Sequence, residues 1–290
     1  MSGTATAQNT GSATAKKDTA KQEEPKKAEG AFRPIISEVL FIVPKGSEGD
    51  ANGDGVRSAT GDEFVEIYNP HDKPIQMKGY RLTDGTPASA KKNPPKTDKQ
   101  DDASKSKDGQ SEEREHVPFE FVFPEFELGT GQVAVVFNGF ESNLTGEVGT
   151  SAKAAKANDK FHGAFVFNAA MTTQYAAFSN THDLVQLVSP EGDAVETVTW
   201  DYRDSEKGGK NAKKNDQAAQ QVSDKHGEKS GGTVRILPNM RIGSAQIRTV
   251  DGDFVSHVAA KGSVFSPGEF SPEKEAKTGK DESKKSNPDD

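Results

Sequence analysis

The octapeptide EFVEIYNP, Glu63–Pro70, carries the clearest strand signal in the chain. Its first six residues alternate glutamates with aromatic and β-branched side chains, and Asn69-Pro70 forms a turn signal. Directly upstream, Gly49–Asp62 (GDANGDGVRSATGD) holds the densest group of oxygen-bearing side chains in the sequence. The sequence therefore predicts a β-strand that is entered from an acidic, glycine-rich loop.

Similar short apolar or alternating segments recur on both sides of this strand. Further strands are predicted at Ile35–Val43, Ile75–Leu82, Phe119–Phe123, Gln132–Phe137, Ala164–Phe167, Leu184–Val188, Ala194–Trp200, Val234–Leu237 and Phe254–Val258. Turns rich in Gly, Pro and Asn separate them, and only the alanine-rich stretch near Ser151–Asn158 has even a weak helical period. Many short strands without intervening helices predict an all-β fold, an antiparallel sandwich or barrel. In the hairpin Leu184–Trp200, we expect Leu184 to be buried.

The composition indicates that part of the chain lies outside any hydrophobic core. Hydrophobic residues make up 31% of the 290 residues, well below the roughly 45–50% (glycine included) of globular domains. Residues 1–30, about 87–115, 203–232 and 272–290 are rich in Lys, Asp, Glu and Ser and nearly free of large apolar side chains. Such segments bury too little surface to offset the entropy of ordering. We therefore predict one sandwich domain over residues 31–271, with two long disordered insertions and disordered tails.

Charge and cysteine content exclude several classes of function. With 45 acidic against 37 basic residues and a net charge of −8, the chain lacks the basic surface of a dedicated nucleic-acid binder. The absence of cysteine excludes disulfides and thiolate metal sites. No segment approaches the roughly 20 apolar residues of a membrane span, and residues 1–30 contain no apolar stretch typical of a secretory signal. We expect a chain that does not span a membrane.

The acidic loop has the residue pattern of a calcium-binding loop. From Asp50 onward, oxygen-bearing side chains occupy positions 1, 3, 5 and 9, a glycine occupies position 6, and a backbone carbonyl is available at position 7. The usual closing carboxylate at position 12 is replaced by Gly61, and Asp62 follows one residue later. The predicted Ca²⁺ ligands are Asp50, Asn52, Asp54, the Val56 carbonyl, Ser58 and Asp62. The alternative is an ion-free turn built by Asx and glycine residues.

The order of several motifs resembles that of the lamin-tail domain. The matching segments are IISEV (Ile35–Val39), EFVEIYNP, MKGYRLTD (Met77–Asp84), FELGTGQVAVVF (Phe126–Phe137), Asn180–Leu187 and Gly192–Val198. The resemblance covers roughly Ile35–Trp200, and FSPG (Phe265–Gly268) is similar to the turn that closes bacterial members. It implies a stand-alone immunoglobulin-like β-sandwich of bacterial type that mediates attachment, which favours an extracellular or surface location. It also adds support to the calcium loop, because bacterial members often carry a similar insertion before this strand.

Several other residues are of types that catalyse reactions or bind metals, but their spacing and surroundings do not favour these roles. Glu38, Glu63 and Glu66 suggest a hydrolytic carboxylate pair, but Glu63 and Glu66 have opposite strand parity and we expect solvated face charges. The six histidines are scattered without zinc-ligand spacing. Ser104–Lys107 matches S-x-x-K within a low-complexity segment that would not lower the pKa of its lysine. Phe119–Phe126 alternates phenylalanines as a core-facing strand would.

These observations favour a non-catalytic binding or scaffolding module with a protein or cell-surface partner. One alternative is a metal-dependent hydrolase, or an accessory module of one, acting on phosphoesters or polysaccharides. A second is nucleic-acid binding through the lysine-rich insertions, although acidic residues accompany nearly every lysine cluster and stacking aromatics are absent there. The partner and the oligomeric state are not encoded in any motif that we recognise.

Overall fold

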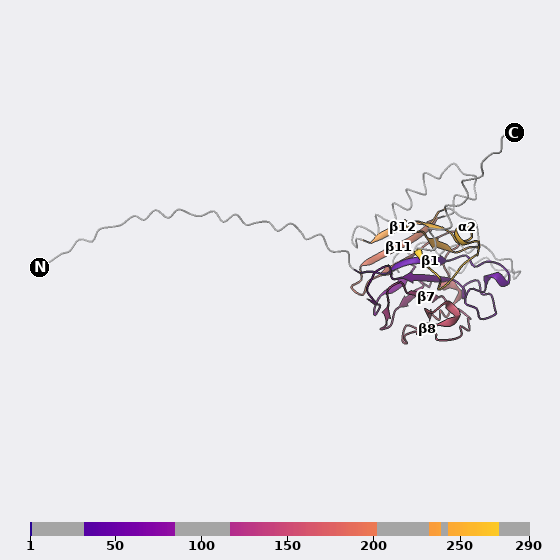
Figure 1. Cartoon of the computed structure of the whole chain (residues 1–290), viewed down its shortest axis with the longest axis horizontal. Coiled ribbons are helices and arrows are strands. Elements are labelled where there is room, and N and C mark those ends of the chain that lie inside the picture. The colour runs from indigo at the N-terminus through magenta and orange to yellow at the C-terminus, as the bar shows by residue number, and fades with distance from the viewer. Residues whose placement is uncertain (2–31, 85–116, 202–231, 239–242, 273–290) are drawn as a thin grey trace, which may run out of the picture. The chain divides into compact units, whose positions relative to one another are not determined.

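The strands of the computed structural model form two main sheets and a small two-stranded one (Figure 1). The seven-stranded sheet has the order β14-β13-β1-β2-β7-β9-β8, the five-stranded sheet β12-β11-β10-β4-β5, and β3 pairs with β6. The strands are β1 (Ile35–Leu40), β2 (Phe64–Tyr68), β3 (Ile75–Gln76), β4 (Arg81–Thr83), β5 (Glu120–Val122), β6 (Glu127–Leu128), β7 (Val133–Phe137), β8 (Ala157–Asn158), β9 (Ala164–Asn168), β10 (His182–Val188), β11 (Ala194–Asp201), β12 (Thr233–Ile236), β13 (Gln246–Arg248) and β14 (Phe254–Ser256).

The structure describes residues 1, 32–84, 117–201, 232–238 and 243–272. The described part from Phe32 onward belongs to one compact unit. Most of the predicted insertions and tails, together with Ser104–Lys107 and the lysine-rich stretches, lie outside the described residues. The helical elements are short: 3-10 helices η1 (Ser47–Gly49), η2 (Asp159–Phe161) and η3 (Gln174–Ala176), and the α-helix α2 (His257–Lys261).

The predicted immunoglobulin-like β-sandwich is confirmed, with two parallel pairings among mostly antiparallel ones. β7 pairs with β9 and β11 with β12 in parallel. A parallel pair needs a crossover of a dozen or more residues, whereas an antiparallel pair is closed by a short hairpin. The segments 138–163 and 202–232 are long enough to supply these crossovers.

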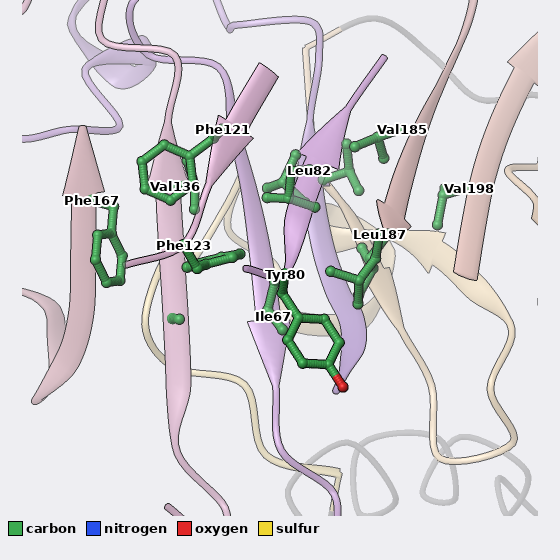
Figure 2. Close-up of a cluster of buried hydrophobic side chains, with 14 of the residues drawn as sticks. Ile67, Tyr80, Leu82, Phe121, Phe123, Val136, Phe167, Val185, Leu187 and Val198 are labelled. Atoms are coloured by element: carbon green, nitrogen blue, oxygen red, sulfur yellow. The ribbon is translucent and has the colours of Figure 1, made fainter. Parts of the chain in front are cut away.

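The main core lies between the two large sheets. Figure 2 shows Ile67, Val136 and Phe167 of the seven-stranded sheet pointing towards Leu82, Phe121, Leu187 and Val198 of the five-stranded sheet. Phe119, Phe121 and Phe123 are all buried, so the predicted core-facing role of this phenylalanine run is confirmed. Trp200 stacks on Phe41 with ring centroids 4.2 Å apart and donates its indole N–H to the Ser179 carbonyl at 2.8 Å.

A second core covers the outer face of the seven-stranded sheet. Leu40, Phe64, Val135, Phe137 and Val166 on that face pack with residues that follow the five-stranded sheet in sequence, among them Ala245, Ile247 and Phe270. Strands β2 and β7 are therefore buried on both faces. Their apolar runs, FVEIY and VAVVF, are typical of strands that have no solvent-facing side.

Several predicted elements differ in detail. Leu184 is only half-buried on the outer face of β10, while Val185 and Leu187 face the core, so the predicted parity of this strand was wrong. The segment Ile75–Leu82 is divided by a turn at Gly79, whose φ is +82°. The alanine-rich stretch ends in the extended pair β8 instead of a helix. Strand β13 was not predicted, because its sequence QIR has little strand character of its own.

Candidate functional site

The acidic loop between β1 and β2 folds around its own side-chain oxygens. The carboxylate of Asp50 accepts the N–H groups of Asp54 at 3.1 Å and Gly55 at 2.9 Å. Asn52 Oδ1 accepts the same Asp54 N–H at 3.0 Å, and Asp54 Oδ1 accepts that of Val56 at 2.8 Å. The alternation of oxygen-bearing residues thus produces overlapping Asx turns.

The buried carboxylate of Asp62 joins the beginning and the end of the acidic loop. One carboxylate oxygen accepts the Asn52 N–H at 2.9 Å and the other the Ser58 N–H at 2.6 Å, and the residue is fully buried. Burial raises the pKa of Asp62 to about 6, and the charges of Asp50 and Asp54 act in the same direction. The charges of Asp50 and Asp54 thus add to the effect of burial, while the N–H groups of Ser58 and Asn52 lower the pKa.

A neighbouring loop, residues 138–143 after β7, joins the acidic loop. Asn143 donates its N–H to Asp54 Oδ2 at 2.7 Å, and Asn52 Nδ2 donates to Ser142 Oγ at 3.0 Å. Ser142 and Asn143 could not be predicted from the sequence, because no local motif indicates a contact across about 90 residues. The two loops form one surface at this end of the sandwich.

The close approach of the two loops explains the displaced closing carboxylate. A Cβ at Gly61 would lie 2.3 Å from the Phe140 carbonyl oxygen and 2.4 Å from Ser142 Oγ. Only glycine fits at this position, so the carboxylate appears at Asp62. The loop accommodates the extra residue because Asp62 leads into a strand and not into a helix.

The donor set fits a hard cation only in part. The three carboxylates accept one described N–H per oxygen atom, which leaves one lone pair on each oxygen. Ser58 Oγ accepts the Gly61 N–H at 2.9 Å, and the Val56 side chain is 67% exposed. Across the part of the chain that the structure describes, no three His, Cys, Asp or Glu side chains form a metal-binding group. Binding of a Ca²⁺ ion would therefore need carboxylate, amide, hydroxyl and carbonyl oxygens together. The Asx turns of the loop would have to shift so that these oxygens face one ion.

The glutamates expected on a solvated face are buried, which corrects that prediction. Glu38 and Glu66 have no exposed surface and Glu63 is 1% exposed. The reason is that both faces of the seven-stranded sheet are covered, so strand residues of either parity are shielded. Glu63 accepts the Phe178 N–H at 3.0 Å, whereas Glu66 contacts Ser37 and Gly268. The two glutamates serve different contacts, as their opposite parity predicts.

Ser266 and His257 lie near these glutamates in an arrangement that resembles a nucleophile and its base. Ser266 Oγ lies 2.7 Å from His257 Nε2, and His257 Nδ1 lies 2.7 Å from the Ser263 carbonyl. The backbone N–H groups of Ser266 and Gly268, however, already donate to Glu38 and Glu66. These amides cannot stabilise an oxyanion, and His257 is fully buried. We interpret the cluster as structural.

The fold defines the class of this protein as an immunoglobulin-like β-sandwich. Comparison with protein families gives a match to the Lamin Tail Domain over residues 35–201, and the chain belongs to this family. The match spans β1 to β11, so the predicted family and the extent of its resemblance are confirmed. The family is one of non-catalytic immunoglobulin-like modules. No curated protein sequence matches the chain. Among the described residues, no helix is both long and apolar enough to cross a membrane.

Proposed function

We propose that this chain is a binding and scaffolding module that attaches to a protein or cell-surface partner through the joined acidic loop and 138–143 loop. The observation that carries the proposal is the link from Asp54 to Asn143 and from Asn52 to Ser142. Loops held on a rigid sandwich are the usual binding elements of such folds. Val56, at the tip of the acidic loop, is an exposed apolar side chain that a partner could cover.

The proposal includes a Ca²⁺ ion as a stabiliser of this surface. Its ligands would be Asp50, Asn52, Asp54, the Val56 carbonyl, Ser58 and Asp62. The gathering of three carboxylates in one loop supports a cation here, since a bound divalent ion would offset the burial of the Asp62 charge and the smaller effect of the Asp50 and Asp54 charges. Extracellular calcium modules bind at about 10⁻⁴ to 10⁻³ M, so such a site would fill outside a cell and empty within it.

The proposal assigns no reaction to the chain. A metal-dependent hydrolase would need an open coordination position beside a substrate cleft, and no described contact favours one. Nucleic-acid binding would depend on the lysine-rich segments, which lie outside the described residues. Neither alternative has a specific observation in its favour.

Thermal unfolding with Ca²⁺ and with a chelator tests the ion. An ion that binds only the folded state raises the melting temperature by mass action, so millimolar Ca²⁺ should raise that of the native chain. Asp54→Asn should lose most of the shift. Asp251→Asn, in the exposed turn between β13 and β14, should keep it. Equal shifts in both variants, or none in the native chain, would remove calcium from the proposal and leave the binding surface to be tested separately.

A further inference from the structure

The buried glutamates of β1 and β2 form a like-charge pair directly across two strands. Glu38 is the register partner of Glu66, and both are fully buried. Their lateral neighbours in the sheet are apolar, because Glu38 lies opposite Ile247 of β13 and Glu66 opposite Val135 of β7. Like charges in this position destabilise a sheet, and the sheet itself offers no cation beside them.

The segment from His257 to Phe270, here named the C-terminal strap, covers this pair. Ser266 donates its N–H to Glu38 at 3.1 Å, and Gly268 donates its N–H to Glu66 at 2.7 Å. These contacts join residues more than 200 positions apart in sequence. Two aromatic contacts hold the strap beside them: Phe265 against Phe64 and Phe270 against Tyr68.

The strap approaches the 3-10 helix η2 so closely that its turn requires glycine. Gly268 has φ +94°, and a Cβ there would lie 2.4 Å from the Phe161 carbonyl oxygen. The strap is therefore fitted to one closed position. Any opening would separate Ser266 and Gly268 from both carboxylates together.

The charged and polar groups that face the pair come from the α2 part of the strap, from the rest of the strap and from β1. From α2, His257 Nε2 lies 3.9 Å from Glu38 Oε2, and Lys261 Nζ lies 3.3 Å from Ser266 Oγ. From the strap, Glu269 adds a negative charge that also pairs with the exposed His162. Ser37 of β1 donates its hydroxyl to Glu66 at 2.7 Å. The two backbone N–H groups and Ser37 suit one ionised carboxylate, while a second buried charge would be poorly compensated.

We propose that Glu38 and Glu66 form a proton-operated latch, which holds the C-terminal strap closed while the pair retains a proton and releases it when both carboxylates ionise. Release would uncover the outer core face around Phe64 and Phe137. The latch is independent of the proposed calcium site. Its carboxylates lie within β1 and β2, whereas the predicted calcium ligands lie in the loop between these strands.

The electrostatics of the pair agree with this geometry. Burial raises the pKa of Glu66 to about 7, and burial together with the Glu66 charge raises the pKa of Glu38 well above its usual range. The carboxylates of Glu38 and Glu66 thus hold protons while the strap is closed and lose them when it opens. A folded pKa above the unfolded value contributes stability that is complete below the unfolded value and is lost as pH rises through the folded value. The latch should hold at about pH 5 and loosen above about pH 7.

Hydrogen–deuterium exchange of the full chain at pH 5.5 and 8.0, corrected for intrinsic exchange rates, tests the latch. Protection of the Ser266 and Gly268 amides should fall on the order of tenfold or more at pH 8.0, and by a larger factor than protection of the β10–β11 hairpin, which falls only with global stability. In Glu38→Gln with Glu66→Gln, strap protection should no longer depend on pH. Glu125→Gln, in the exposed pair with Lys78, should retain the dependence. A pH-independent strap in the native chain, or an unchanged dependence in the double variant, would overturn the proposal.

A second measurement does not require any variant to fold. Carboxyl ¹³C NMR of the native chain, with the resonances assigned, should show Glu66 titrating at about pH 7 and coupled to Glu38, at the pH where strap protection falls. Titration of Glu66 below pH 5.5 would overturn the proposal on its own, whatever the behaviour of the buried Glu63.

Discussion

Glu196 on β11 and Arg248 on β13 form a buried ion pair that joins the two large sheets. Arg248 Nε also donates to the Ile36 carbonyl at 2.7 Å, and the Ile36 N–H donates to Glu196 at 2.8 Å. Both side chains are about 5% exposed or less. The Ile36 N–H thus links β1 to Glu196 of the opposite sheet, and the Ile36 carbonyl links it to Arg248 of its own sheet.

Breaking this pair should be costly. Arg248→Met leaves Glu196 with the Ile36 N–H and the partly exposed Arg235, whose Nε lies 3.6 Å away, and should lower the free energy of unfolding by about 3–5 kcal/mol. Urea unfolding, followed by fluorescence of the single tryptophan, Trp200, measures this loss. The control is Lys78→Met in the exposed pair with Glu125, which should cost less than about 1 kcal/mol. Similar losses in both variants would contradict the role of the buried pair.

Global stability should fall from acidic to neutral pH. Asp62, Glu63, Glu38 and Glu66 all have pKa values raised by burial, so each contributes stability that is lost as pH rises through its folded pKa. For Glu66 alone the difference between pH 5 and pH 8 should be roughly 2–3 kcal/mol. Urea midpoints at the two pH values give the result. Glu66→Gln should show a smaller difference, and a native chain that is more stable at pH 8 would refute the assignment of these groups.

Gly61 should tolerate no side chain. Gly61→Ala places a methyl group 2.3 Å from the rigid Phe140 carbonyl and should lower stability by about 1–3 kcal/mol, while weakening the contact between the two loops. Gly129→Ala is the matched control, since its methyl group would meet only the flexible end of Gln132. The melting temperatures of the two variants give the comparison. Equal, small decreases would show that the two loops are not held together at this point.

The sequence predicted the inner faces of the sandwich better than its outer faces. Runs such as Phe119–Phe123 and Val133–Phe137 bury enough apolar surface to be recognised locally. The burial of Glu38 and Glu66 could not be predicted, because the strap that covers them lies more than 200 residues away in sequence. A period-2 pattern indicates that one face is buried but not that both are. Leu184 shows a related limit, since in LVQLV (Leu184–Val188) apolar residues occur at both parities and leave the buried face of the strand open.

The candidate calcium ligands Asp50, Asn52, Asp54 and Asp62 stay a prediction drawn from local spacing. The contacts of the loop were predicted only in part. The alternative of an ion-free turn built by Asx and glycine residues did anticipate that backbone N–H groups of the loop would donate to these side chains. Local spacing could not find Ser142 and Asn143, which meet the acidic loop only in the folded sandwich.

Capture of binding partners by the immobilised full chain, with quantitative identification of the proteins retained from cell-surface extracts, tests the proposed binding surface most directly. Val56→Asp places a charge at the tip of the acidic loop, and Val250→Asp makes the same change at an exposed turn of β13–β14, where Val250 is 51% exposed against 67% for Val56. Partners retained by the native chain in Ca²⁺ should be lost from Val56→Asp and kept by Val250→Asp. A partner that binds both variants as well as the native chain would contradict a role for the acidic-loop surface.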